Sequence, residues 1–243
     1  MAFQRHLQLS KLIQDRCVVS KILSRFSYSN LKVQLTKIWP VVLVGIFVSL
    51  GGAGITVLVA ALTDNPIWKL AKDPAEVMQF PSYIGMLSNW GVLLWIASAV
   101  ICLFGVAVLK QYEVPKDTLR FITGSGLLSL ILGIDDLYRL HDKIFPKMFH
   151  LPEKFFYILY IFIFLLYLAM FAARIMEYEF LLFGAAFFLL VVSRRIVVII
   201  PFFNQFMTTG DMLKYFGIVF WLAFFYRTVL HEITSLINKN KTA

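Results

Sequence analysis

The feature that most constrains this chain is a series of apolar runs, each close to the ~20 residues that an α-helix needs to cross a bilayer. Of its 243 residues, 60% are hydrophobic and only 15% are charged. A soluble domain is about 45–50% apolar and about a quarter charged. The sequence therefore predicts an all-α, polytopic integral membrane protein. We expect a bundle of six transmembrane helices, over residues 39–62, 90–109, 118–145, 155–173, 180–200 and 215–236.

Residues 1–38 precede the first apolar run and are rich in Lys and Arg. A helix over residues 9–26 has one apolar side and one basic side, so it is expected to lie in the membrane interface and to meet anionic lipid. A mitochondrial presequence has a similar composition, and that alternative stays open. We predict a basic amphipathic surface segment over 1–38, a transmembrane domain over 39–237 and a short tail over 238–243.

The distribution of basic residues predicts the orientation. With the N-terminus in the cytoplasm, the cytoplasmic segments hold thirteen Lys and Arg residues and the opposite side holds seven. This bias places both termini in the cytoplasm. The formal net charge of +9 is then explained by contact with anionic lipid, and no nucleic-acid partner is expected.

Small residues recur every four positions in two of the runs, which lets another helix approach closely. They are Gly45, Ser49 and Ala53 in the first run and Ser125, Ser129 and Gly133 in the third. Between the first two runs, Asp73, Pro74 and Glu76 form the pattern of an N-cap, a first helical residue and an N3 glutamate. We expect a short helix there, ending before Pro81.

A charged cluster lies at the far end of the third run. Ionisable groups at membrane depth are costly, so each is a candidate functional residue. The cluster comprises Asp135, Asp136, Arg139, His141 and Asp142, together with Arg194 and Arg195 of the fifth run.

The distance of each charged residue from the cytoplasmic end of its helix indicates which charges lie at the same depth in the membrane. At 1.5 Å per residue, Asp135 lies ~26 Å along its helix from Thr118, and Arg194 lies ~23 Å from Glu179. We therefore expect the third and fifth helices to be neighbours, with Asp135 or Asp136 paired to one of the two arginines. We also expect one continuous helix, without a break before Pro146, to carry the cluster through the interface.

A second cluster is predicted at the cytoplasmic ends of the last three spans, and it comprises Arg174, Glu177, Glu179, Arg227, His231 and Glu232. Arg227 is expected to reach Glu177 or Glu179, or to extend to lipid phosphate.

The sequence predicts no catalytic residue, no metal and no cofactor. It contains no P-loop, HExxH or GxGxxG motif. Asp136 and His141 are five residues apart and point to different sides of one helix, so a metal site would need ligands from other helices.

One segment carries a resemblance. Residues 135–142, Asp-Asp-Leu-Tyr-Arg-Leu-His-Asp, resemble a DDLxxLH[DE] segment found in uncharacterised bacterial multi-pass membrane proteins, including cyanobacterial ones. Residues 214–223 are similar as well. The resemblance implies a bacterial cell membrane or a cyanobacterial thylakoid as the location, and it implies no activity.

Three functional hypotheses remain at this point. The first is a non-catalytic membrane subunit or assembly partner, favoured by short loops and small-residue seams. The second is a small transporter or channel that uses the intramembrane Asp/Arg cluster. The third is an intramembrane enzyme that acts on a lipid or depends on a metal.

Overall fold

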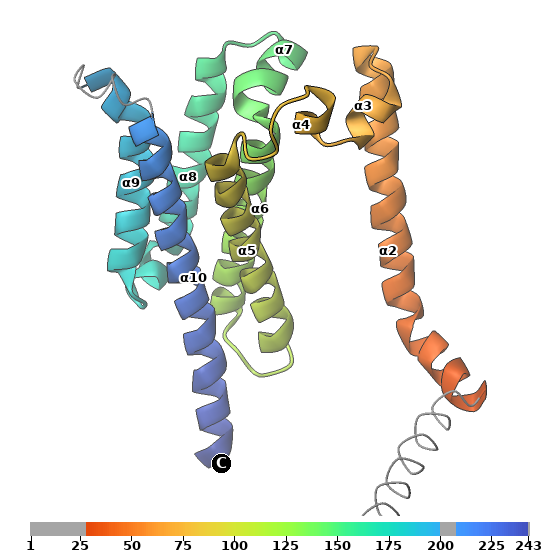
Figure 1. Cartoon of the computed structure of the whole chain (residues 1–243). Helices are drawn as coiled ribbons and strands as arrows, with labels where there is room; N and C mark the ends of the chain where they lie inside the picture. The colour runs from red at the N-terminus through yellow and green to blue at the C-terminus, as the bar shows by residue number, and fades with distance from the viewer. Residues whose placement is uncertain (1–27, 200–207, 243) are drawn as a thin grey trace, which may run out of the picture. The chain divides into compact units, whose positions relative to one another are not determined.

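The computed structural model describes residues 28–199 and 208–242, and in these ranges every regular element is helical. The amphipathic helix predicted over residues 9–26 lies outside the described residues. The chain divides into two compact units at Ile84 and Gly85. Unit 1 contains α2 (Tyr28–Thr63), α3 (Ile67–Ala71) and α4 (Pro74–Val77). Unit 2 contains α5 (Met86–Leu109), α6 (Lys116–Tyr138), the π-helical turn η1 (Leu140–Ile144), α7 (Phe145–Phe149), α8 (Glu153–Met176), α9 (Phe180–Ile199) and α10 (Thr208–Thr242) (Figure 1).

Among the described residues, five helices are long and apolar enough to cross a membrane. The candidate spans are Ile38–Thr63, Met86–Leu109, Lys116–Tyr138, Lys154–Met176 and Gly210–Lys239. They identify an integral membrane protein with several spans. In α9 the apolar helical stretch among the described residues is Phe180–Ser193, which is shorter than the five candidate spans, so the sixth span stays a prediction.

In unit 1, the short helix predicted after the first span is present. Asp73 caps α4, because its carboxylate accepts a hydrogen bond from the backbone N–H of Ala75 at 2.7 Å and a longer one from that of Glu76 at 3.4 Å. Pro74 takes the first helical position, as predicted. The helix ends at Val77, well before Pro81.

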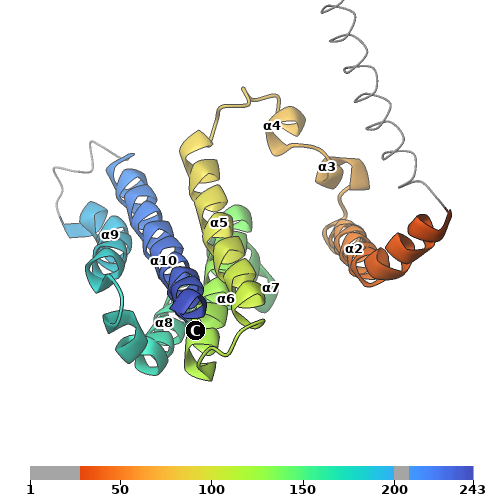
Figure 2. The ribbon, with the colours of Figure 1, turned by 90° about the horizontal axis from the view of Figure 1, so that it is seen from below.

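In unit 2, α5 packs against both α6 and α10, and α9 packs along α10 (Figure 2). Large aromatic side chains fill the centre of this bundle. Those less than 6% exposed include Trp95, Phe121, Phe183, Trp221, Phe224 and Phe225. Edge-to-face ring contacts, such as Trp95 against Trp221 at 5.4 Å between centroids, join α5 to α10.

The small-residue seam predicted in α6 packs closely against its neighbours. A Cβ atom on Gly133 would lie 3.0 Å from the Cβ of Trp95 on α5, so only glycine fits there without a shift. Ser125 forms a 2.7 Å hydrogen bond with the hydroxyl of Tyr167 on α8. Ser129 accepts a 2.9 Å hydrogen bond from the indole of Trp221 on α10. The seam therefore ties α6 to three helices.

The continuous helix predicted over residues 118–145 is wrong. The α-helix α6 ends at Tyr138, and Arg139 adopts a left-handed backbone conformation with φ of 53°. The cause is the carboxylate of Asp135, which accepts the backbone N–H of His141 at 2.9 Å. A side-chain acceptor thus replaces the helical carbonyl that a continued α-helix would have offered that N–H.

Candidate functional site

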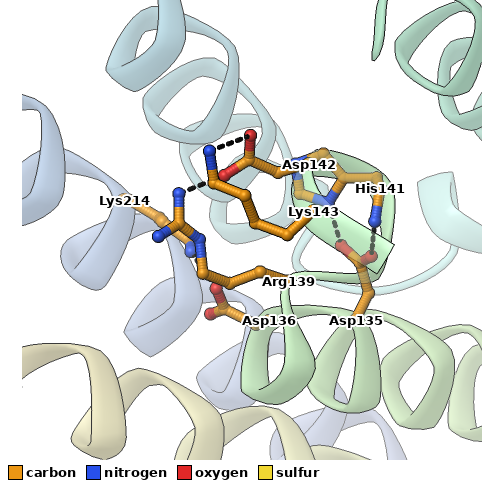
Figure 3. Close-up of polar contacts among 7 residues, drawn as sticks. All are labelled: Asp135, Asp136, Arg139, His141, Asp142, Lys143 and Lys214. Atoms are coloured by element: carbon orange, nitrogen blue, oxygen red, sulfur yellow. Dashed lines mark hydrogen bonds and ion pairs between the residues drawn. The ribbon is translucent and has the colours of Figure 1, made fainter. Parts of the chain in front are cut away.

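The end of α6 is organised by Asp135, whose residue is 6% exposed. Its carboxylate accepts the backbone N–H of His141 and also binds Nδ1 of the same imidazole (Figure 3). The rings of Tyr157 and Tyr160 on α8 lie roughly perpendicular to this imidazole, at 5.1 and 5.7 Å between centroids. The predicted site residues Asp135 and His141 therefore form a buried pair that also fixes the turn after α6.

The adjacent carboxylate points to a different helix. Oδ1 of Asp136 pairs with the ammonium group of Lys214 on α10, and their side chains are 14% and 29% exposed. The other oxygen, Oδ2, is buried and has no hydrogen-bond partner among the described residues. A Cβ atom on Gly91 of α5 would lie 3.9 Å from this oxygen. Three helices thus converge on Asp136.

Sequence reasoning did not select Lys214, which it counted only among the basic residues on the side opposite the cytoplasm. Lys214 lies seven residues into α10, and Asp136 lies two residues before the end of α6. Since α10 and α6 have opposite directions in Figure 1, these positions fall at the same end of the bundle. The calculation of depth from helical rise, applied to the sixth span, places Lys214 near the level of Asp136, but it does not choose between this lysine and the arginines of the fifth span.

The neighbour relation predicted between the third and fifth spans is wrong. In the described residues α6 packs chiefly along α5, and α9 packs along α10. The side chains of Arg194 and Arg195 lie outside the described part of the structure. The partners that the structure gives to the two aspartates are His141 and Lys214.

The remaining residues of the cluster lie on the turn itself. Arg139 pairs with Asp142, and Nζ of Lys143 lies 3.7 Å from the same carboxylate. Burial raises the pKa of Asp142, but the hydrogen bond and positive charge of Arg139, with smaller contributions from Lys143 and His141, outweigh it and lower the pKa below its ordinary value. Asp142 is therefore a carboxylate at neutral pH.

The second cluster lies at the opposite end of unit 2, about 20 Å further along α10 by residue count. Arg227 donates two hydrogen bonds to Glu179, one of the two partners expected for it. These hydrogen bonds lower the pKa of Glu179. Arg174 donates to Glu177 at 2.7 Å.

The other two predicted residues of this cluster contact Tyr178, which sequence reasoning did not select. Tyr178 donates a 2.7 Å hydrogen bond to Glu232, and its ring lies 5.9 Å from that of His231. Burial, together with the hydrogen bond and charge of Glu232, raises the pKa of Tyr178. The turn between α8 and α9 is thereby held against α10.

The described residues contain no group of three or more His, Cys, Asp or Glu side chains that could hold a metal ion. The two clusters contain charged pairs that join helices. They also contain one buried carboxylate oxygen, Oδ2 of Asp136, that is able to accept a further hydrogen bond. A family model described as a domain of unknown function (DUF8692) matches residues 31–228. No curated protein and no solved structure matches the chain.

Proposed function

Since this chain belongs to the DUF8692 family of domains of unknown function, we propose its function from its own geometry: it is a non-catalytic membrane subunit that assembles with a partner membrane protein. The observation that carries this proposal is that ionisable side chains of both clusters form pairs within the protein. Asp135 holds the turn after α6 through His141, Asp136 binds Lys214 on α10, and Arg227 binds Glu179. Side chains engaged in this way stabilise a bundle instead of facing a substrate.

Unit 1, taken by itself, supports assembly. Among the described residues, a Cβ atom on Gly45 or Gly52, on the glycine-containing face of α2, would meet nothing within 4 Å. Small residues let the backbone of another transmembrane helix approach closely, which is the usual basis of helix association in lipid. We propose that a helix of the partner packs on this face, in a bacterial membrane with both termini cytoplasmic.

Native mass spectrometry of the full-length chain, extracted from its own membrane in mild detergent, tests the proposal. We expect a complex of fixed stoichiometry, and we expect the variant with Gly45→Leu and Gly52→Leu to lose the partner while unit 2 keeps its unfolding temperature. The matched control is Gly184→Leu, on α9, where an added Cβ also meets nothing within 4 Å. A monomer as the sole species would contradict the proposal.

One observation favours a second candidate, a small transporter. The buried Oδ2 of Asp136 has no partner among the described residues, and intramembrane carboxylates often mark ion or proton pathways. Flux measured in proteoliposomes is then expected to disappear in Asp136→Asn and to persist in Asp142→Asn, whose carboxylate lies on the turn outside the spans. Proteoliposomes without flux, containing the folded chain, would exclude this candidate.

A further inference from the structure

The connection between α6 and α8, residues 139–152, combines exposed apolar side chains with exposed cations. We propose that this connection is a binding surface for anionic phospholipid headgroups. The side chains that form this surface are exposed: Lys143, Ile144, Lys147, Met148 and Phe149.

The position of the connection places it at the membrane surface. It begins directly after the candidate span Lys116–Tyr138 and ends just before the candidate span Lys154–Met176. Figure 1 shows α7 at the shared end of α6 and α8. A segment that joins the ends of two spans must lie at the interface, whichever side of the membrane that end faces.

Apolar side chains on this segment are divided between the bundle and the outside. Phe145 packs inward, with its ring 5.6 Å from that of Phe156 on α8. Ile144, Met148 and Phe149 are 42%, 56% and 52% exposed. Exposed apolar side chains at a membrane surface enter the boundary between headgroups and acyl chains. The outer face of η1 and α7 is therefore suited to lipid.

Exposed cations lie beside these apolar side chains in the sequence. Lys143 and Lys147 are exposed and lie four residues apart, next to Ile144 and Met148, which have the same spacing. Residues 139–152 contain three Lys or Arg residues and one carboxylate, Asp142. That carboxylate pairs with Arg139 and lies 3.7 Å from Nζ of Lys143, so it offsets one of the three positive charges and leaves the segment cationic. Lysines at this level extend along apolar surface and place their ammonium groups among phosphates.

A phospholipid matches both rows of side chains, since it carries a phosphate and acyl chains in one molecule. Inorganic phosphate offers nothing to Ile144 or Met148. A zwitterionic lipid offers acyl chains, but its headgroup has no net charge. The combination on this connection therefore favours an anionic phospholipid.

The test uses the full-length chain in nanodiscs, with Cys17→Ser and a fluorophore on Met148→Cys. Quenching by headgroup-labelled phosphatidylglycerol is compared with quenching by headgroup-labelled phosphatidylcholine. We expect the anionic lipid to be preferred by about fivefold or more, and we expect Lys143→Gln with Lys147→Gln to remove the preference. Replacing both lysines by arginine keeps the charge and should keep the preference.

The matched control is Lys110→Gln with Lys116→Gln, and it should leave the preference intact. These two exposed lysines lie at the end of α5 and the start of α6. Equal quenching by both lipids in the chain with its lysines unchanged would overturn the proposal. So would a reporter shielded from both lipids, which would point to a protein partner, or a preference abolished by inorganic phosphate. Loss of the preference in the control pair would assign the effect to net charge and not to this surface.

Discussion

At the residue scale, Arg139 shows how one position ends a helix. Left-handed backbone conformations cost an L-residue other than glycine about 1 kcal/mol or more, yet Arg139 adopts one with φ of 53°. The two contacts of Asp135 with His141 hold the following turn in place and offset this cost. The left-handed conformation of Arg139 is therefore maintained by the contacts of the Asp135 carboxylate and not by the intrinsic backbone preference of arginine.

The strain at Arg139 is testable with two substitutions. Arg139→Gly and Arg139→Ala both remove the ion pair with Asp142, but only glycine accepts φ of 53° without steric cost. We expect the glycine variant to be more stable than the alanine variant by about 1 kcal/mol. The measurement is chemical unfolding of both purified variants in the same detergent. Equal stabilities would mean that the backbone at this position is not strained.

Glu179 gives a prediction for pH. Its pKa lies below the ordinary value of 4.5, because Arg227 hydrogen-bonds to the ionised form. A carboxyl whose pKa is lowered on folding stabilises the folded state above the unfolded pKa, and this stabilisation is lost as the pH falls through the folded pKa.

Thermal unfolding from about pH 7 to about pH 3 should therefore show a smaller acid-induced loss of stability in Glu179→Gln than in the unchanged chain. The effect is expected to be small, since the Glu179 side chain is 42% exposed and solvent screens such pairs. Glu76→Gln, whose carboxylate pairs with Lys72 in unit 1, serves as a control for removing a surface carboxylate. Identical profiles for Glu179→Gln and the unchanged chain would contradict the assignment.

At the scale of elements, most helices were predictable, because an apolar run of suitable length has few alternatives in a bilayer. The first span ends at Thr63 and α5 ends at Leu109, each within one residue of its predicted end. The end of α6 was not predictable in the same way. The apolar residues of α6 give no sign that the helix ends at Tyr138. The break depends on the carboxylate of Asp135, which accepts the backbone N–H of His141 six positions later.

Packing between helices gives a prediction at the same scale. A Cβ atom on Gly217 of α10 would lie 2.9 Å from Cγ of Leu190 and 3.1 Å from the backbone oxygen of Ala186, both on α9. Gly217→Ala should push these helices apart and destabilise the protein by about 1–3 kcal/mol.

Gly184→Ala is the matched control for this substitution. Gly184 lies on α9, where an added Cβ meets nothing within 4 Å, so alanine should be neutral or stabilising by up to about 1 kcal/mol. The comparison is made by unfolding both variants in detergent. Equal effects at the two positions would mean that α9 and α10 do not pack closely at Gly217.

At the scale of the whole molecule, the sequence identified which residues carry charge into the membrane, but it did not identify all their partners. Arg227 and Glu179 were predictable, since the turn between α8 and α9 and the end of the last span lie at the same level. Lys214 was not, because the choice between partners for Asp136 depends on which helix lies beside α6. Apolar periodicity does not determine that choice, since lipid and protein interiors are equally apolar.

The central claim is that the ionisable groups of the polar cluster hold helices together, and the Asp136–Lys214 pair tests it most directly. The measurement is a double-mutant cycle with Asp136→Asn, Lys214→Met and the combined variant, followed by unfolding in one detergent. We predict a coupling free energy of about 1–3 kcal/mol between the two positions, with the double variant more stable than the sum of the single losses implies. Additivity within about 0.5 kcal/mol would contradict the account.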